Sequence, residues 1–140
     1  MAASPRALAP VLLVALVIPC LNEEHTIGDV IDEAKVTGCF SSIYVGDNGS
    51  SDRSVEIAEA RGATVIRISR PGKGNVVRRF FADVEADVYV MVDGDATYSL
   101  AGVEAMVTDI VQGRADMSIG TRVEGQEDDA FRRGHKIGNW

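Results

Sequence analysis

Apolar runs alternate with amphipathic segments along this chain, beginning near the N-terminus. The run from Val11 to Ile18 is rich in Val and Leu, which is typical of a strand buried on both faces. The segment after it has apolar residues at helical spacing. They are Ile27, Val30, Ile31 and Ala34. We expect Asn22 to cap this helix and Gly38 to end it.

The same order of strand and helix repeats along the rest of the chain. The further predicted strands lie at 42–45, 63–68, 88–92 and 115–120. The further predicted helices lie at 52–61, 75–86 and from Ser99 to Gly113. Repeated strand–helix–strand units connect by right-handed crossovers, which bring the strands into one parallel sheet. The sequence therefore predicts an α/β, Rossmann-like nucleotide fold, with a mostly parallel sheet and helices on both faces.

Composition and charge narrow the class of protein. The chain has 140 residues, of which 46% are hydrophobic and 25% are charged, and this fits one globular domain. We expect that domain at 11–123, after a disordered segment at 1–10 and before an acidic loop and a basic segment at 124–140. The net charge of −7 disfavours nonspecific binding to nucleic acid. The N-terminal apolar run is too short to span a membrane, which takes about 20 residues.

Two cysteines, Cys20 and Cys39, are separated by the first predicted helix, which runs back across the sheet. They should lie roughly 20 Å apart, beyond the reach of a disulfide. We expect both to be free thiols, and free thiols favour a reducing, cytoplasmic compartment. Pro19, directly before Cys20, also argues against cleavage of a signal peptide at that point.

Polar residues collect where the predicted strands end. They are Pro19, Asn22, Asp47, Arg70, Asp93, Asp95 and Arg122. The carboxyl ends of parallel strands meet at one edge of the sheet, and α/β folds bind their ligands there. The sequence therefore predicts that this edge carries the functional site.

Asp93 and Asp95 follow an apolar strand in the segment VDGDATY. Two carboxylates in such a place repel each other by about 1 kcal/mol in water and by more when partly buried, so a cation between them is favourable. Oxygen ligands alone favour Mg²⁺ or Mn²⁺ over zinc. The alternative is a solvated loop in which the aspartates form a turn and cap the next helix.

The segment from Asp93 to Thr97 also matches the Asp-x-Asp-x-Thr pattern of haloacid-dehalogenase-type phosphatases, in which the first aspartate is the nucleophile. Too few residues follow it for the further lysine and acidic ligands which that chemistry requires. The strand–helix units before it would also be unexplained. A phosphatase is therefore the less favoured interpretation.

Four segments occur in an order and spacing that resemble the family 2 glycosyltransferases, which have the GT-A nucleotide-sugar fold. They are VIPCLNEEHTI at 17–27, VGDNGSSDRS at 45–54, RPGKGN at 70–75 and VDGDATY at 92–98. With SIGTR at 118–122 and FRRGHKIGN at 131–139, they are similar to the polyprenol-phosphate sugar transferases, typified by dolichol-phosphate mannose synthase. The resemblance covers nearly the whole chain from Leu12. Relatives of this type continue past the last motif, so we expect this chain to be part of a longer protein.

The resemblance implies a nucleotide pocket built from three of these segments. The residues that would line it are Pro19, Asn22, Glu23, Asp47, Lys73 and Gly74. Asp47 would accept a hydrogen bond from an N–H of the base, because a carboxylate is only an acceptor. The family often has a second aspartate where this chain has Asn48, so the role of Asn48 stays open. The structural alternative is that the residues after Asp47 build a turn and that PGKG is an ordinary loop.

The resemblance also implies how metal and phosphate would be held. Asp95 would bind the metal, and Asp93 would reach the ribose or the metal and its bound water. Arg122 and either Arg132 or Arg133 would hold phosphate, since one guanidinium group can donate two parallel hydrogen bonds to two phosphate oxygens. For at least one of the two adjacent arginines, the alternative is a solvated surface.

The implied reaction is metal-dependent transfer of a sugar, with inversion, from a nucleotide diphosphate sugar of the UDP-glucose or GDP-mannose class to a polyprenol phosphate. The acceptor phosphate is already anionic at neutral pH, so a strong general base is unnecessary. This agrees with His25 and His135, which are expected at the surface. An alternative from a different class is a noncatalytic module that binds nucleotide sugars.

The C-terminal segment FRRGHKIGNW combines basic residues with Phe131, Ile137 and Trp140, after the acidic EGQEDD. Such a mixture is typical of an interfacial helix near anionic headgroups. We therefore expect contact with the cytoplasmic face of a membrane through this segment.

Overall fold

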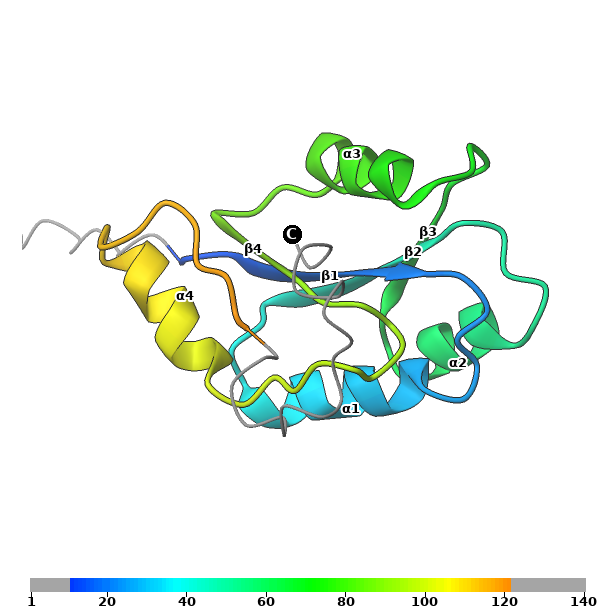
Figure 1. Ribbon diagram of the computed structural model, residues 1–140, viewed down its shortest axis with the longest axis horizontal. Helices are drawn as coiled ribbons and strands as arrows, with labels where there is room; N and C mark the ends of the chain where they lie inside the picture. The colour runs from blue at the N-terminus through cyan, green and yellow to red at the C-terminus, as the bar shows by residue number, and fades with distance from the viewer. Residues whose placement is uncertain (1–10, 122–140) are drawn as a thin grey trace, which may run out of the picture.

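The computed structural model describes residues 11–121, which form one sheet between layers of helices (Figure 1). The four strands are all parallel and lie in the order β3-β2-β1-β4. The strands are β1 (Val14–Cys20), β2 (Ser42–Asp47), β3 (Thr64–Arg67) and β4 (Val88–Met91). The helices are α1 (Ile27–Thr37), α2 (Ser54–Ala60), α3 (Lys73–Asp83) and α4 (Val103–Val111). This architecture confirms the predicted α/β fold with a parallel sheet.

Helices cover both faces of the sheet, as predicted. In the view of Figure 1, α1 and α2 lie below the sheet and α3 lies above it. β1 divides its side chains between the two cores, because successive residues of a strand point to opposite faces. Leu16 and Ile18 belong to the core on the side of α1, whereas Ala15 and Val17 pack with Phe80 of α3. All of β1 is therefore buried. No helix within residues 11–121 has the length and apolar character needed to cross a membrane.

Pro19 lies inside β1, a central strand, where a residue without an N–H group is unusual. The carbonyl of Cys20 faces β2, because it accepts a hydrogen bond of 3.0 Å from the N–H of Asn48. Neighbouring residues of a parallel strand bond to opposite sides, so the nitrogen of Pro19 faces the side of β4. The register of β1 with β4 ends at Val17 and Met91, so Pro19 costs the sheet no hydrogen bond.

Gly46 of β2 allows α3 to approach the sheet closely. A Cβ atom at this position would lie 2.4 Å from Cγ1 of Val76 and 2.7 Å from Cζ of Phe80. Both of these α3 side chains are buried, so they have little room to move away. The glycine thus sets the height of α3, whose first residue is Lys73, above the strand that ends at Asp47.

Asn22 does not cap α1, which corrects the prediction from sequence. The cap position is Thr26, and α1 begins at Ile27. Asn22 has a left-handed backbone with φ of 54°, and its side-chain oxygen accepts a hydrogen bond of 2.8 Å from the N–H of Ser51. Its polar group therefore connects two loops and is not available to the helix.

The strand predicted at 115–120 is wrong, because the described residues form no strand there. Met117 and Ile119 are 76% and 83% exposed, and the sheet formed by residues 11–121 pairs no strand with this segment. A strand is stable only beside a neighbour that takes its hydrogen bonds, and a short apolar pattern does not supply that neighbour.

The other predicted elements are present, with shifted ends. β1 begins at Val14 rather than Val11, and α4 begins at Val103 rather than Ser99. α3 spans Lys73–Asp83, so it starts two residues before its predicted position and ends three residues earlier. These shifts leave the order of strands and helices unchanged.

Both cysteines are free thiols, as predicted. Cys20 is buried at the end of β1, and Cys39 is partly buried. Burial raises the pKa of the Cys20 thiol, so it stays protonated at neutral pH and packs as a small apolar side chain.

Candidate functional site

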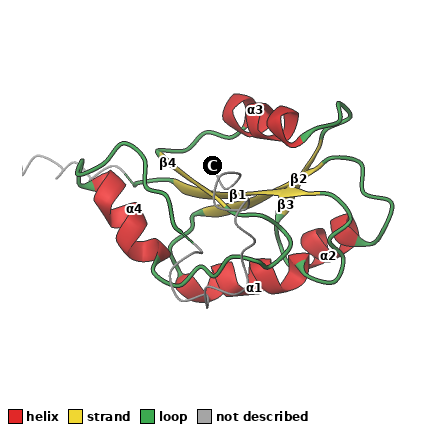
Figure 2. Cartoon of the chain, in the orientation of Figure 1, coloured by secondary structure: helices red, strands yellow, loops and turns green. Residues whose placement is uncertain are grey.

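The loops that follow the four strands gather at one edge of the sheet, because all four strands run in the same direction (Figure 2). This edge holds the predicted site residues of the described part of the chain. They are Pro19, Asn22, Glu23, Asp47, Lys73, Gly74, Asp93 and Asp95. The predicted phosphate ligands Arg122 and Arg132 lie outside the described residues, so their roles stay predictions.

Lys73 and Asp93 are brought together by the fold. The ammonium group of Lys73, the first residue of α3, forms an ion pair with Oδ1 of Asp93 in the loop after β4. α3 follows β3, and β3 and β4 are the two edge strands of the sheet, so this pair links loops from both sides of the site. The side chains of Lys73 and Asp93 are 55% and 30% exposed, which leaves both within reach of a ligand.

Asp95 lies in a tight turn after β4. Its Oδ1 accepts hydrogen bonds from the N–H of Thr97 at 3.0 Å and from the hydroxyl of Thr97 at 2.6 Å. Between them, Ala96 has φ of 58°, a left-handed conformation that costs a residue with a Cβ atom about 1 kcal/mol or more. The hydrogen bonds to Thr97 hold the carboxylate in one orientation.

Gly94 and Thr26 attach this acidic loop to the start of α1. The hydroxyl of Thr26 donates a hydrogen bond of 2.7 Å to the carbonyl of Gly94. A Cβ atom on Gly94 would lie 3.3 Å from Cδ1 of Ile27 and 3.5 Å from the carbonyl oxygen of Pro19, so a glycine fits best here. The sequence contained no signal for Thr26, because its partner is 68 positions away.

Asp47 is almost fully buried at the end of β2, with 4% of its surface exposed. Its carboxylate oxygens accept hydrogen bonds from the N–H groups of Gly49 at 3.3 Å and Ser50 at 3.0 Å. Asp47, Gly49 and Ser50 therefore form the turn that the structural alternative predicted. Each carboxylate oxygen can accept a second bond, so recognition of a base by Asp47 stays a prediction.

Asn48 connects the loop after β2 to the loop after β3. Its Nδ2 donates to the carbonyls of Ile68 at 3.0 Å and Arg70 at 2.9 Å, and its Oδ1 accepts from the N–H of Gly72 at 2.7 Å. One amide therefore fixes the backbone of the segment that carries Lys73. This role was missed from sequence, where the position was left open.

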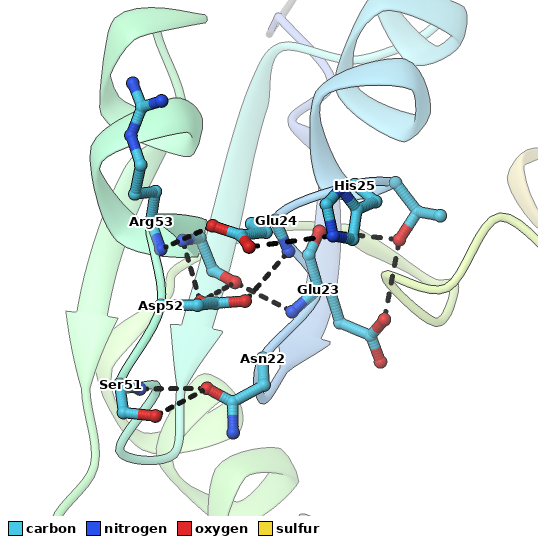
Figure 3. Close-up of polar contacts among 9 residues, drawn as sticks. Asn22, Glu23, Glu24, His25, Ser51, Asp52 and Arg53 are labelled. Carbon is cyan, nitrogen blue, oxygen red and sulfur yellow. Dashed lines mark hydrogen bonds and ion pairs between the residues drawn. The ribbon is translucent and has the colours of Figure 1, made fainter.

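A cluster of polar contacts joins the loop after β1 to the loop before α2 (Figure 3). The buried hydroxyl of Ser54 accepts from the N–H of Glu23 at 2.7 Å and donates to Asp52 at 2.5 Å. The other carboxylate oxygen of Asp52 accepts from the N–H of Glu24 at 3.1 Å, and Glu24 in turn accepts from the N–H of Arg53 at 3.2 Å. These bonds hold the backbone of the first motif, Asn-Glu-Glu, against the second.

The pKa of Asp52 should make this cluster sensitive to acid. Partial desolvation raises the pKa of Asp52, but hydrogen bonds from Ser54 and from the N–H of Glu24 outweigh it, so the pKa lies below its ordinary value of 3.8. The stability that this carboxylate confers is complete above the ordinary value and is lost as the pH falls through the lowered one. Below about pH 4, the unfolding free energy of the wild type should therefore fall more steeply than that of Asp52→Asn. Urea denaturation at a series of pH values measures both slopes, and equal slopes would contradict the expectation.

An Asn48→Asp substitution should weaken the loop that carries Lys73. A carboxylate cannot donate, so it would face the carbonyl oxygens of Ile68 and Arg70 with like partial charge and leave both without their donor. We expect a loss of about 1 to 3 kcal/mol in unfolding free energy at neutral pH, measured by urea denaturation. Asn75→Asp is the matched control, because Asn75 donates one bond to the Pro71 carbonyl. If the Asn48 variant loses no more stability than the Asn75 variant, the bridging role is wrong.

The two aspartates after β4, Asp93 and Asp95, fit a divalent cation only together with a further ligand. Asp93 and Asp95 supply hard oxygen donors of the kind that Mg²⁺ and Mn²⁺ prefer. Across residues 11–121, no three Asp, Glu, His or Cys side chains lie close enough to hold a metal ion by themselves. Mg²⁺ commonly binds through one or two carboxylates and completes its shell with water and phosphate oxygens. The two aspartates therefore fit a cation that is shared with a bound diphosphate.

Comparison with known sequences gives a family and several relatives. The sequence model described as "Glycosyl transferase family 2" matches residues 15–139. Protein RfbJ of Shigella flexneri is 44% identical over 123 residues, which cover 88% of this chain and 95% of RfbJ. Glycosyltransferase AglJ of Haloferax volcanii is 36% identical over 127 residues, which cover 90% of this chain and 41% of AglJ.

Comparison with solved structures finds glucosyl-3-phosphoglycerate synthase from Mycobacterium tuberculosis. Its complex with Mn²⁺, UDP-glucose and phosphoglyceric acid matches with a TM-score of 0.65 and 31% identity, over 73% of this chain and 40% of that chain. Its complex with UDP matches with the same TM-score and identity, over 73% of this chain and 41% of that chain. These similarities support the GT-A fold, and this chain spans about two fifths of the solved proteins.

Proposed function

This chain belongs to glycosyl transferase family 2, and we propose that it transfers a sugar from a nucleotide diphosphate sugar to a polyprenol phosphate with the help of Mg²⁺ or Mn²⁺. The observation that carries the proposal is the gathering of Asp47, Lys73, Asp93 and Asp95 at one sheet edge. The M. tuberculosis relative holds UDP-glucose and Mn²⁺, which favours a UDP-sugar over a GDP-sugar as the donor.

In this proposal, the donor lies across the loops that follow β1, β2 and β3. The base contacts Pro19 and the carboxylate of Asp47, and the diphosphate lies toward Lys73 and Gly74. The left-handed turn at Asn22 and the hydrogen-bonded cluster around Ser54 keep the first loop in one conformation before the donor arrives. Such preorganisation lowers the entropy that must be lost on binding.

Asp93 and Asp95 would hold the divalent cation at the diphosphate. A bound cation would supply charge neutralisation for the nucleoside diphosphate as it leaves. Asp93 is also paired with Lys73, so the lysine can turn toward the phosphates once the carboxylate has another positive partner. Binding of the cation by Asp93 and contact of Lys73 with the phosphates are therefore expected to form together.

The transfer itself is a direct displacement at the anomeric carbon. An oxygen of the acceptor phosphate forms the new bond while the bond to the nucleoside diphosphate breaks, and the bonding electrons leave with the diphosphate. The configuration at the anomeric carbon inverts. The attacking oxygen is already anionic, so the task of the protein is to align both substrates and to stabilise the departing charge. Arg122 and Arg132, outside the described residues, are proposed to hold the acceptor phosphate.

A second candidate acceptor is a small phosphorylated acid. The M. tuberculosis relative is solved with phosphoglyceric acid beside its sugar donor, which supports this alternative. The polyprenol acceptor is supported by the basic and apolar segment 131–140. A lipid acceptor would also place the reaction at a membrane surface, which we propose to be the cytoplasmic face.

The proposal is tested by incubating the whole chain with radiolabelled UDP-glucose or GDP-mannose, Mn²⁺ and polyprenol phosphate. Metal-dependent radioactivity in the organic phase would support transfer to the lipid. Radioactivity in an anionic water-soluble product, formed only when phosphoglyceric acid is added, would support the second acceptor. Binding of the donor without any product would indicate a noncatalytic module, and release of inorganic phosphate from polyprenol phosphate or phosphoglyceric acid would indicate a phosphatase.

A further inference from the structure

A groove lies between the end of β3, the loop after it and the outer side of α3. Its volume is about 440 Å³, which is within the range of small-ligand pockets. Its lining residues are Arg67, Ile68, Ser69, Arg70, Asn75, Arg78, Arg79 and Ala82. None of the residues proposed to hold the sugar donor or the metal lines it, and the loop after β3 lies between this groove and the proposed donor site.

Three arginines in this groove lack a partner within the described residues. The side chains of Arg67, Arg70 and Arg78 are exposed, and none of them makes an ion pair or a hydrogen bond in the part of the chain from 11 to 121. The other Lys and Arg side chains of that part all have partners. They are Lys35, Arg53, Arg61, Lys73, Arg79 and Arg114.

This concentration of free positive charge runs against the composition of the chain. The net charge is −7, so carboxylates are abundant, and within residues 11–121 five of the nine Lys and Arg side chains form an ion pair with one. Guanidinium groups that line one groove repel each other, and a bound anion removes this repulsion. A charge on an edge strand can prevent pairing with another sheet, and this explains Arg67 at the end of β3. It does not explain Arg70 in the loop or Arg78 on the helix.

The backbone that carries these arginines is held in place. Asn48 donates to the carbonyl of Arg70 and accepts from the N–H of Gly72, so the loop is tied to β2. Arg78 is on α3, whose buried Val76 and Phe80 anchor it to the sheet. The three arginines therefore have fixed backbone positions, and binding of a ligand has to order only their side chains.

We infer that this groove binds a phosphate group through Arg67, Arg70 and Arg78. Guanidinium groups donate pairs of parallel hydrogen bonds that match phosphate oxygens, and three of them suit a dianion. The phosphate belongs either to a free phosphorylated compound or to an anionic lipid headgroup. The inference does not depend on the proposed sugar transfer, because it uses other residues.

The test uses the whole chain and compares two triple variants with equal change in net charge. The groove variant is Arg67→Gln, Arg70→Gln, Arg78→Gln, and the control is Lys35→Gln, Arg53→Gln, Arg114→Gln. Inorganic phosphate and pyrophosphate are titrated while the side-chain Nε–H signals of the three groove arginines are followed by NMR. We expect saturable shifts in the wild type and the control, and at least a tenfold weaker affinity in the groove variant. Arg78→Gln alone serves if the triple variant does not fold.

Vesicles then distinguish the two sources of phosphate. Sedimentation with phosphatidylcholine vesicles, with and without phosphatidic acid, is compared for the same variants. Binding that needs phosphatidic acid and is lost only in the groove variant supports a lipid headgroup. Phosphate binding without groove-dependent vesicle binding supports a free phosphorylated ligand. Unshifted arginine signals, or equal affinities in the groove variant and the control, would overturn the inference, whether or not the chain transfers sugar.

Discussion

Asp95→Asn should reduce metal-dependent transfer by about a thousandfold, which corresponds to roughly 4 kcal/mol of transition-state stabilisation. The substitution keeps the shape of the side chain, and the amide oxygen can still accept the bonds from Thr97, so the turn should persist. What is lost is the negative charge that would share a cation with the diphosphate. The rate of transfer and the affinity for the metal should therefore fall, and the unfolding free energy should stay unchanged.

Two measurements separate this effect from a change in structure. Calorimetry with UDP-glucose should give an affinity that rises with Mn²⁺ for the wild type and does not respond to Mn²⁺ for Asp95→Asn. Asp116→Asn is the matched control, because Asp116 is an exposed aspartate in the segment after α4 and is not one of the proposed site residues. The same response to Mn²⁺ in the Asp95 variant and the control would exclude Asp95 as a metal ligand.

Gly46→Ala is expected to lower the unfolding free energy by about 2 kcal/mol. The added methyl group would lie 2.4 Å from Cγ1 of Val76 and 2.7 Å from Cζ of Phe80, which is far inside van der Waals contact. Both neighbours are about 1% exposed and belong to the same core, so α3 must move away from β2 to make room. Because Lys73 begins that helix, the ion pair with Asp93 should be disturbed as well.

Gly74→Ala makes the same chemical change in α3 instead of β2, and it makes no clash. A Cβ atom at Gly74 would have no neighbour within 4 Å, and alanine is favoured over glycine in a helix by about 1 kcal/mol. Urea denaturation should therefore show opposite effects for the two variants. A loss at Gly46 no larger than the change at Gly74 would show that the close approach of α3 is not needed for stability.

The double variant Gly46→Ala, Val76→Ala tests the clash between the new methyl group and the Val76 side chain directly. Val76→Ala removes the methyl group nearest the new one, so it should cost less in the Gly46→Ala background than in the wild type. An interaction of about 0.5 kcal/mol or more between the two substitutions is the expected result. Additive effects would assign the loss of stability to another cause.

The arrangement of the site could be predicted only in part. The aspartates were found because each follows a strand, and the carboxyl ends of parallel strands must meet at one edge. Lys73 was implied only by the resemblance to family 2 glycosyltransferases. Their partners could not be predicted, because the ion pair between Lys73 and Asp93 joins residues 20 positions apart whose distance depends on how α3 lies over the sheet. The bridging roles of Asn48 and Thr26 were missed for the same reason.

Local patterns in the sequence by themselves determined the order of strands and helices, the parallel sheet with helices on both faces, and the edge that holds the polar residues. Hydrophobic period and strand ends are properties of neighbouring residues, so they can be read without the fold. Only the tertiary structure decided the partner of Asn22, the absence of a strand at 115–120 and the gathering of Arg67, Arg70 and Arg78 in one groove. Each of these depends on contacts between segments far apart in the chain, and such contacts form only when the strands and helices pack together.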